Sequence, residues 1–169
     1  MIREIVTDPF FLSQKSEPAT KQDQQVIQDL LDTIHAHADH CVGMAANMIG
    51  VRKTILVAQI GATYQILINP VIVEQSDHLV PFSEGCLSIP GISCEIERPD
   101  HVVVEAYDLD ANLIRYEASG DLFCVCLQHE IDHLHGNTMF ERLKPMQRIK
   151  AVKEYQDALA RGARPGETE

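Results

Sequence analysis

Residues 121 to 135 form a run without proline or glycine that ends before Gly136, and this run constrains the fold most strongly. The pattern predicts a helix that stops at the glycine. It contains the sequence HEIDH, in which His129 and His133 are four positions apart and Glu130 follows the first histidine. Residues four apart share a helical face, so the two imidazoles can bind one ion and the glutamate can reach a water beside it. An ordinary polar helix can contain the same letters, so a metal site needs a third ligand.

The composition favours a single soluble domain over residues 1–169. A chain of 169 residues with 45% hydrophobic residues can bury one core and is short for two domains. Its net charge of −11 opposes binding to phosphate backbones, so DNA is not an expected partner.

The first residues and the cysteines indicate a cytoplasmic protein. The opening sequence MIREIVTDPFFLSQ mixes charged with apolar side chains, unlike a signal peptide, and no apolar run approaches membrane-spanning length. The 5 cysteines are odd in number and lack the spacing of a disulfide framework, which suits a reducing compartment. We therefore expect no membrane partner, and free thiols or a metal ligand among the cysteines.

Helices and strands are expected in separate parts of the chain. A capping box at Thr20 to Asp23 and helical spacing of apolar residues predict a helix over about 21–37. β-rich segments follow at 54–60 and 64–73, joined as a hairpin through Gly61. Further elements are expected as strands at 92–98, 101–108 and 113–118, a turn at 108–112, a C-terminal helix at about 146–160 and a polar tail to residue 169. This segregation predicts an α+β fold.

Three placements compete for the third metal ligand. The pattern HExxHxxGxxH fails because Met139 occupies the place of its last histidine. Glu154 could serve as a glutamate ligand, but its surroundings are typical of a solvated helix face. Cys86, in SEGCLSIPG at 83–91, offers a thiolate, a strong ligand for zinc or ferrous iron. Its alternative is a small buried cysteine in a loop before a turn at Pro90 and Gly91.

Taken together, three segments resemble the signatures of peptide deformylase. EGCLS at 84–88 and QHEIDHLHG at 128–136 are similar to its second and third signatures, and CVGMAANMIG at 41–50 is similar to its first, GxGxAAxQ. The resemblance extends over about residues 1–155. It implies antiparallel sheets packed around a central helix that carries HExxH. It also implies a hydrolase that removes the formyl group from the N-terminal methionine of nascent peptides and releases formate.

The resemblance assigns roles to the metal site. It implies that Cys86, His129 and His133 bind one divalent ion, Fe2+ in the cell, with Zn2+, Ni2+ or Co2+ able to replace it. Glu130 matches the general base and acid, which takes a proton from water and gives it to the departing amine.

The resemblance also locates the groups that stabilise the oxyanion, and there the sequence departs from the family. The backbone N–H of Leu87 matches one donor, but Met48 stands at the position of the glutamine that supplies another. A thioether donates no hydrogen bond, and loss of one such donor typically lowers turnover by about a hundred- to a thousandfold. Cys41 likewise replaces the first glycine. Either the chemistry is lost or redirected, or a neighbour such as Asn47 supplies the donor.

Helical spacing predicts an apolar wall beside the ion. Leu122 and Cys126 lie on the face of the two histidines, with Val125 next to them. The resemblance implies that this wall holds the methionine side chain, together with Phe82. Val125 could instead be ordinary core, and Cys126 could be a rival metal ligand one turn before the first histidine.

Other expected contacts concern the peptide backbone and the ligand segment. Val42 and Gly43 resemble the strand that pairs with an extended peptide. Glu84 is expected to support the ligands or to line the pocket rim, with a plain surface acid as the alternative. Arg98 and Asp132 could pair and brace the site.

The C-terminal helix carries a basic group within an otherwise acidic chain: Lys144, Arg148, Lys150 and Lys153. The arrangement resembles that of some bacterial deformylases. Those proteins use their terminal helix to dock on the ribosome, near nascent chains. A solvated amphipathic helix is the alternative, and the favoured one.

Overall fold

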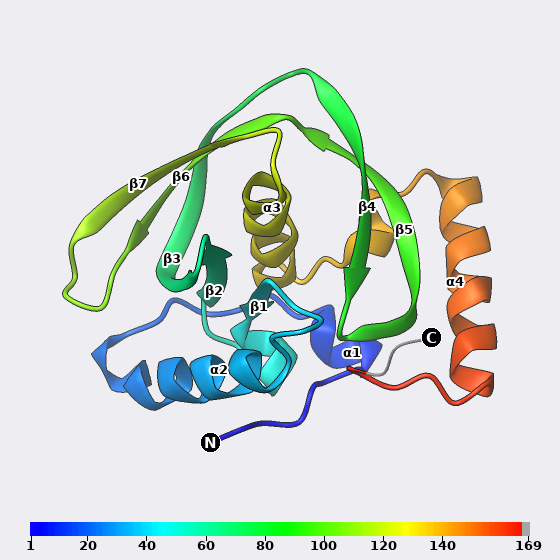
Figure 1. Cartoon of the computed structure of the whole chain (residues 1–169), viewed down its shortest axis with the longest axis horizontal. Coiled ribbons are helices and arrows are strands. Elements are labelled where there is room, and N and C mark those ends of the chain that lie inside the picture. Colours follow the sequence, from blue (N-terminus) through cyan, green and yellow to red (C-terminus); the bar gives the residue numbers. More distant parts are fainter. Residues whose placement is uncertain (167–169) are drawn as a thin grey trace.

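Helix α3 (Leu122–Leu134) stands at the centre of the molecule, with antiparallel strands on both sides of it (Figure 1). The computed structural model describes residues 1–166. Asp121 caps the helix by accepting a hydrogen bond from the Cys124 backbone N–H at 2.8 Å, and Gly136 ends it with a φ of +82°. The predicted α+β class and the central helix are confirmed.

A five-stranded antiparallel sheet lies on one side of α3, in the order β1-β2-β3-β6-β7. Its strands have the bounds β1 Gly43–Ala45, β2 Ile55–Ile60, β3 Thr63–Gln75, β6 His101–Tyr107 and β7 Leu113–Ser119. The predicted hairpin between β2 and β3 is confirmed, and Gly61 adopts a φ of +60° at its turn. Asp108 accepts backbone hydrogen bonds from Asp110 and Asn112 at 2.9 Å each, which forms the expected turn before β7.

A two-stranded sheet lies on the other side of α3 and consists of β4 (Leu79–Cys86) and β5 (Ile89–Pro99). Cys86 therefore ends a strand and does not lie in a loop. Because Cys86 is paired with Ile89, the reversal occurs at residues 87 and 88, and the turn expected at Pro90 and Gly91 falls inside β5. The pairing of β4 with β5 decides where the chain reverses. Local turn signals do not reveal that pairing, and this explains the difference.

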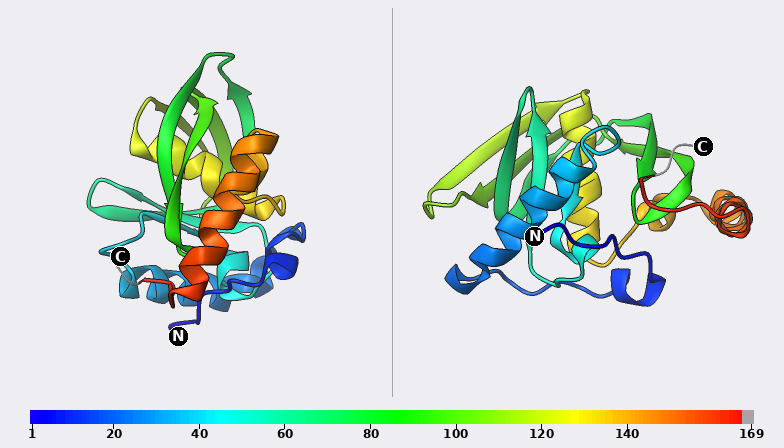
Figure 2. Two further views of the ribbon diagram at one scale, coloured as in Figure 1. Left: turned by 90° about the vertical axis from the view of Figure 1, so that its right-hand side faces the viewer. Right: turned by 60° about the horizontal axis from the view of Figure 1, so that its bottom comes forward.

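The C-terminal helix α4 (Pro145–Ala160) packs on the outer face of β5 (Figure 2), close to its predicted bounds. With η3 (Met139–Arg142) it closes a small core that contains Ile89, Cys94, Ile96, Met139, Ala151 and Tyr155. Residues 167–169 of the expected polar tail lie outside the described part of the chain.

The larger core lies between α3, the five-stranded sheet and α2 (Gln24–Ala36). The predicted capping box is present at η1 (Lys21–Asp23), where Asp23 accepts the Thr20 N–H at 2.7 Å. The remaining short elements are α1 (Pro9–Leu12) and η2 (Ala46–Ile49). Among the described helices, none has the length and apolar character needed to cross a membrane.

Candidate metal centre and active site

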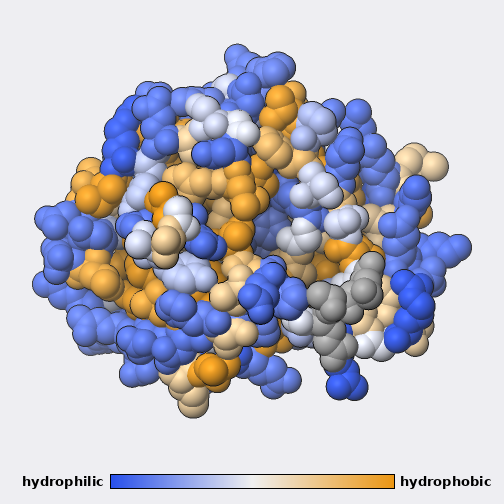
Figure 3. Space-filling model, in the orientation of Figure 1, coloured by the Kyte–Doolittle hydropathy of each residue, from blue (hydrophilic) through white to orange (hydrophobic). Residues whose placement is uncertain are grey.

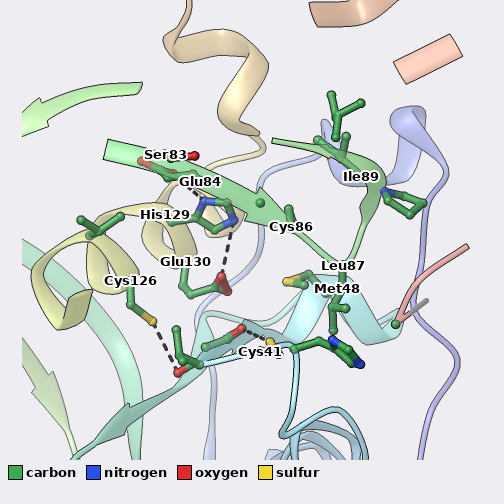
Figure 4. A pocket seen from close by; sticks show the side chains of 18 of the residues that line it. Cys41, Met48, Ser83, Glu84, Cys86, Leu87, Ile89, Cys126, His129 and Glu130 are labelled. Carbon is green, nitrogen blue, oxygen red and sulfur yellow. Dashed lines mark hydrogen bonds and ion pairs between the residues drawn. The ribbon is translucent and has the colours of Figure 1, made fainter. Parts of the chain in front are cut away.

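Cys86, His129 and His133 converge in the centre of the molecule. Each offers one ligand atom, and the three atoms all lie within 4.8 Å of one another. Sγ of Cys86 is 3.2 Å from Nε2 of His133, and the two imidazole centroids are 5.0 Å apart. The end of β4 supplies the sulfur and two successive turns of α3 supply the nitrogens, as Figure 4 shows for Cys86 and His129.

This donor set fits a divalent transition metal. One thiolate and two imidazoles suit zinc or ferrous iron, and three protein ligands leave a position open, as a catalytic site requires. Nδ1 of His129 donates to Glu84 at 2.8 Å, which leaves its Nε2 for an ion.

The charges within the cluster favour a thiolate at Cys86. Burial alone would raise the pKa of its thiol, but the charge of His133 and hydrogen bonds from both histidines outweigh burial and hold the pKa well below its usual value. For each histidine burial lowers the pKa, but Cys86 and the neighbouring carboxylates, Glu130 for both rings and Glu84 for His129, together raise it by more. A thiolate is the form of cysteine that binds a metal.

A buried chain of ion pairs supports the ligands from behind. Arg98, fully buried, donates to both carboxylate oxygens of Glu84, at 2.5 and 2.8 Å, and to Asp132 at 2.9 Å. Arg142 holds the other side of Asp132 with hydrogen bonds of 2.9 and 2.6 Å. The predicted pair of Arg98 and Asp132 is present. Glu84 is 5% exposed, so it is not a surface acid, and its carboxylate is engaged with His129 and Arg98.

Glu130 lies beside the ligand cluster. Its Oε1 is 3.7 Å from Nε2 of His129, and its buried Oε2 has no hydrogen-bond partner among the described residues. Burial raises the pKa of this carboxyl, and the charges of the neighbouring imidazoles lower it less than burial raises it. The free oxygen can accept a proton from a water or a substrate at this position.

A cavity of about 350 Å³ opens next to the cluster, a size suited to a small ligand. Figure 3 shows apolar surface beside a hollow in the middle of the face that is turned to the viewer in Figure 1. Of the predicted residues, the cavity is lined by Val42, Gly43, Met48, Glu84, Leu87, Leu122, Val125, Cys126 and Glu130.

Phe82, expected to hold the methionine side chain, is half-buried and is not among the described residues that line this cavity. It lies four residues before Cys86, roughly 13 Å away along an extended strand. Its neighbour Ser83 does line the cavity, and a contact of Phe82 with the methionine side chain stays a prediction.

The cavity borders the free edge of the five-stranded sheet. Strand β1 pairs only with β2, and the Gln59 N–H donates to the carbonyl of Val42 at 2.8 Å. Backbone groups of successive residues point to opposite edges of an antiparallel strand, so the N–H and C=O of Gly43 face away from β2. That carbonyl accepts the Cys41 thiol at 2.8 Å. The backbone N–H of Gly43, and a carbonyl that the Cys41 thiol occupies, therefore border the cavity.

Gly43 has a second, steric role. A Cβ at this position would lie 2.2 Å from Sγ of Cys126 and 3.2 Å from Cγ of Glu130. The backbone of β1 thus passes directly over α3, and only glycine permits this approach.

The first signature contributes no side-chain amide to the cavity. Met48 is buried in the wall, and its sulfur lies 3.4 Å from the Ala45 N–H, which donates to it. Asn47 is fully buried and donates from Nδ2 to the His133 carbonyl at 2.8 Å, so its amide is directed at α3. Asn47 therefore does not replace the missing glutamine at the cavity.

Cys126 does not join the ligand cluster. Its Sγ donates to the Val42 carbonyl at 3.6 Å. Burial, reinforced by the charge of Glu130, raises the pKa of its thiol well above the usual value, so it stays protonated and binds metal poorly. Of these two thiols, Cys86 lies in the cluster that could hold a metal ion, and Cys126 lines the cavity wall.

The sequence and structure match one family throughout. The model of the polypeptide deformylase family matches residues 2–149. The chain belongs to this family. The peptide deformylase of Maricaulis maris is 38% identical over 162 residues, which cover 90% of this chain and 91% of that protein. That of Clostridium beijerinckii is 44% identical over 138 residues, covering 80% and 98%. The crystal structure of a deformylase from Legionella pneumophila is 31% identical, with a TM-score of 0.83 and coverage of 95% and 96%.

Several residues of the site gave no signal in the sequence. Arg142 joins the ion-pair chain from η3, and His40, Arg164 and Gly166 reach the cavity from outside the three signatures. They arrive through tertiary folding, which local motifs do not encode.

Proposed function

We propose that the chain is a metal-dependent peptide deformylase in which Glu130 carries the protons. The observation that supports this most directly is the meeting of Cys86, His129 and His133 beside the unpartnered carboxylate oxygen of Glu130. Its substrate is a peptide that begins with formyl-methionine, and its products are formate and the peptide with a free amino terminus. We place this reaction in the cytoplasm, on nascent chains.

Cys86, His129 and His133 hold the metal ion, which we propose is Fe2+ in the cell, with Zn2+, Ni2+ or Co2+ able to take its place. When bound, such an ion lowers the pKa of a coordinated water and polarises a carbonyl oxygen. Glu84 fixes the ring of His129 through Nδ1, and Arg98 holds Glu84 in turn, so the ligands are preorganised.

Glu130 accepts one proton as water oxygen forms a bond to the formyl carbon. The carboxyl then gives that proton to the peptide nitrogen as the carbon–nitrogen bond breaks, and the bonding electron pair leaves with the amine. One water is consumed, and formate and an amine are released. The raised pKa of Glu130 suits a group that must both take and return a proton.

The peptide lies along the free edge of β1. The N–H and C=O of Gly43 bond its backbone, a form of strand addition that depends little on side chains. The methionine side chain packs on the wall made by Leu122, Val125 and Cys126.

Stabilisation of the oxyanion is the weakest function of this site. The backbone N–H of Leu87, next to the sulfur ligand, is the donor that remains, because Met48 has no hydrogen to give. We therefore propose a divergent family member whose turnover is slower than that of a glutamine-containing enzyme. The second candidate is action on another small amide, which the same missing donor favours.

Helix α4 is the candidate ribosome contact. Met146 and Ile149 are exposed, 79% and 67%, beside the basic residues Arg148 and Lys150. Apolar anchors with cationic neighbours suit a surface of nucleic acid and protein.

Formate release from a formyl-methionyl peptide tests the proposed function. The protein is loaded anaerobically with Fe2+, because oxygen attacks a thiolate ligand. We expect release by the wild type and a loss of at least a hundredfold in Glu130→Gln at equal metal content. Equal rates in the two proteins would refute the role of Glu130. Absence of release from this peptide, with release from another formamide, would favour the second candidate.

A further inference from the structure

The segment that follows α4 turns back across the catalytic cavity. Gly162 has a φ of +91°, and the Ala163 N–H donates to the Ala158 carbonyl at 3.0 Å, the reversal that commonly ends a helix. Arg164 and Gly166 then line the same cavity as Cys86 and Glu130. In Figures 1 and 2 this red segment runs from the end of α4 past the tip of the β4-β5 pair. Arg164 and Gly166 are therefore part of the site.

Packing holds this segment in place. A Cβ on Gly166 would lie 2.9 Å from Nδ1 of His37, so the backbone touches the end of α2. Ala163, Pro165 and Gly166 are half-buried, whereas Arg164 is exposed. The backbone is anchored while the Arg164 side chain stays accessible.

The charge at Arg164 has no counterpart within the described chain. It is the only lysine or arginine among the described residues that line the cavity, and no described carboxylate lies within 4.0 Å of it. The carboxylates of the lining are Glu84, which Arg98 neutralises, and Glu130, which faces the ligand cluster. Among residues 1–166 no carboxylate pairs with this guanidinium, so in a chain of net charge −11 it is available for an anion from outside.

We propose that Arg164 binds a carboxylate of the substrate peptide, downstream of the formyl-methionine. The proposal rests on the proposed function, which places the formyl group at Glu130 and the peptide along Gly43. The carboxylate is either an acidic side chain or the free C-terminus of a short peptide, and a guanidinium recognises both in the same bidentate way. The site would thus prefer acidic sequences after methionine, by roughly two- to fivefold for an exposed pair.

A peptide panel tests this specificity. Formyl-methionyl tripeptides carry Glu, Gln or Lys at the second or third residue, each as a C-terminal amide and as a free acid. The amides isolate the side chain, and the free acids add the terminal carboxylate. We measure kcat and KM separately, at low and high salt. The wild type should favour Glu over Gln through KM, and salt should weaken the preference.

Variants assign the preference to one residue. Arg164→Gln should remove the Glu over Gln preference, and Arg164→Glu should reverse it toward Lys. Arg161→Gln is the matched control, because Arg161 is exposed nearby and is not among the described lining residues. It should keep the wild-type ratio. A preference that persists in Arg164→Gln, or equal values for all peptides in the wild type, would overturn the inference.

A binding measurement separates this inference from the proposed function. Calorimetry on Glu130→Gln with the same formyl peptides gives dissociation constants without turnover. If acidic peptides bind more tightly and Arg164→Gln abolishes this in the Glu130→Gln background, Arg164 acts as proposed even if no formate appears. If formate is released and Arg164→Gln leaves both the binding and kinetic ratios unchanged, the deformylase function stands and the role of Arg164 is refuted.

Discussion

Oε1 of Glu84 accepts a hydrogen bond from Nδ1 of His129 at 2.8 Å, across 45 residues of sequence. The same carboxylate is bound twice by Arg98, so a strand of one sheet orients a ligand on the central helix. The contact fixes which imidazole nitrogen faces the ion.

Removal of this contact should weaken metal binding. We expect Glu84→Gln to lower metal affinity by roughly ten- to a hundredfold, because the amide supports the imidazole less well and removes one of the two carboxylates that Arg98 binds. Competition with a chelator measures the affinity. Glu95→Gln, on the exposed face of β5, is the control and should bind as tightly as the wild type. Equal metal affinity in Glu84→Gln and the wild type would show that Glu84 and Arg98 do not position His129.

Gly43→Ala should destabilise the protein, because its Cβ would overlap Sγ of Cys126 at 2.2 Å. Overpacking of this kind typically costs about 1–3 kcal/mol in the free energy of unfolding. The double variant Gly43→Ala/Cys126→Ala removes the clashing sulfur and should recover part of that loss. Denaturant unfolding of the wild type, Gly43→Ala, Cys126→Ala and the double variant gives the coupling energy between the two positions. Strict additivity of the two changes would contradict the close approach of β1 to α3.

The thiols should differ in reactivity. The pKa of Cys86 is held well below the ordinary value, which favours its thiolate in the metal-free protein. Burial raises the pKa of Cys41 to about 12, so pH 7 lies far below that pKa and Cys41 stays protonated. Iodoacetamide should therefore label Cys86 first, and metal should protect it. Peptide mass spectrometry measures each site. Faster labelling of Cys41 than of Cys86 would reverse the assigned order.

Met48→Gln should raise kcat on formyl-methionyl peptides. The amide would supply the donor that the thioether lacks, a contribution worth up to about a hundred- to a thousandfold where geometry allows. Met48→Leu, of similar size and without a donor, should leave kcat close to that of the wild type. A kcat for Met48→Gln no higher than that for Met48→Leu would show that this position does not limit turnover.

Local sequence patterns predicted the elements whose signals are complete within one segment. The Asp121 cap and Gly136 bound α3 as expected, and Gly61 sets the β2-β3 turn. The strand that ends at Cys86 was missed because it contains Pro81 and Gly85 and is defined by its pairing with β5.

The same contrast between local signals and tertiary contacts applies to the residues of the site. The two histidines share a helical face, so spacing alone placed them together, whereas Cys86 needed the family resemblance. The inward direction of Glu84 depends on Arg98, and Arg164 reaches the cavity only because the chain reverses at Gly162. Such contacts depend on tertiary packing.

X-ray absorption at the zinc edge of the zinc-loaded protein tests the metal centre most directly. We predict one sulfur at about 2.3 Å and two imidazole nitrogens at about 2.0–2.1 Å in the wild type. The sulfur signal should vanish in Cys86→Ser and persist in Cys126→Ser. A wild-type spectrum without sulfur, or a sulfur signal that survives in Cys86→Ser, would contradict the site built from Cys86, His129 and His133.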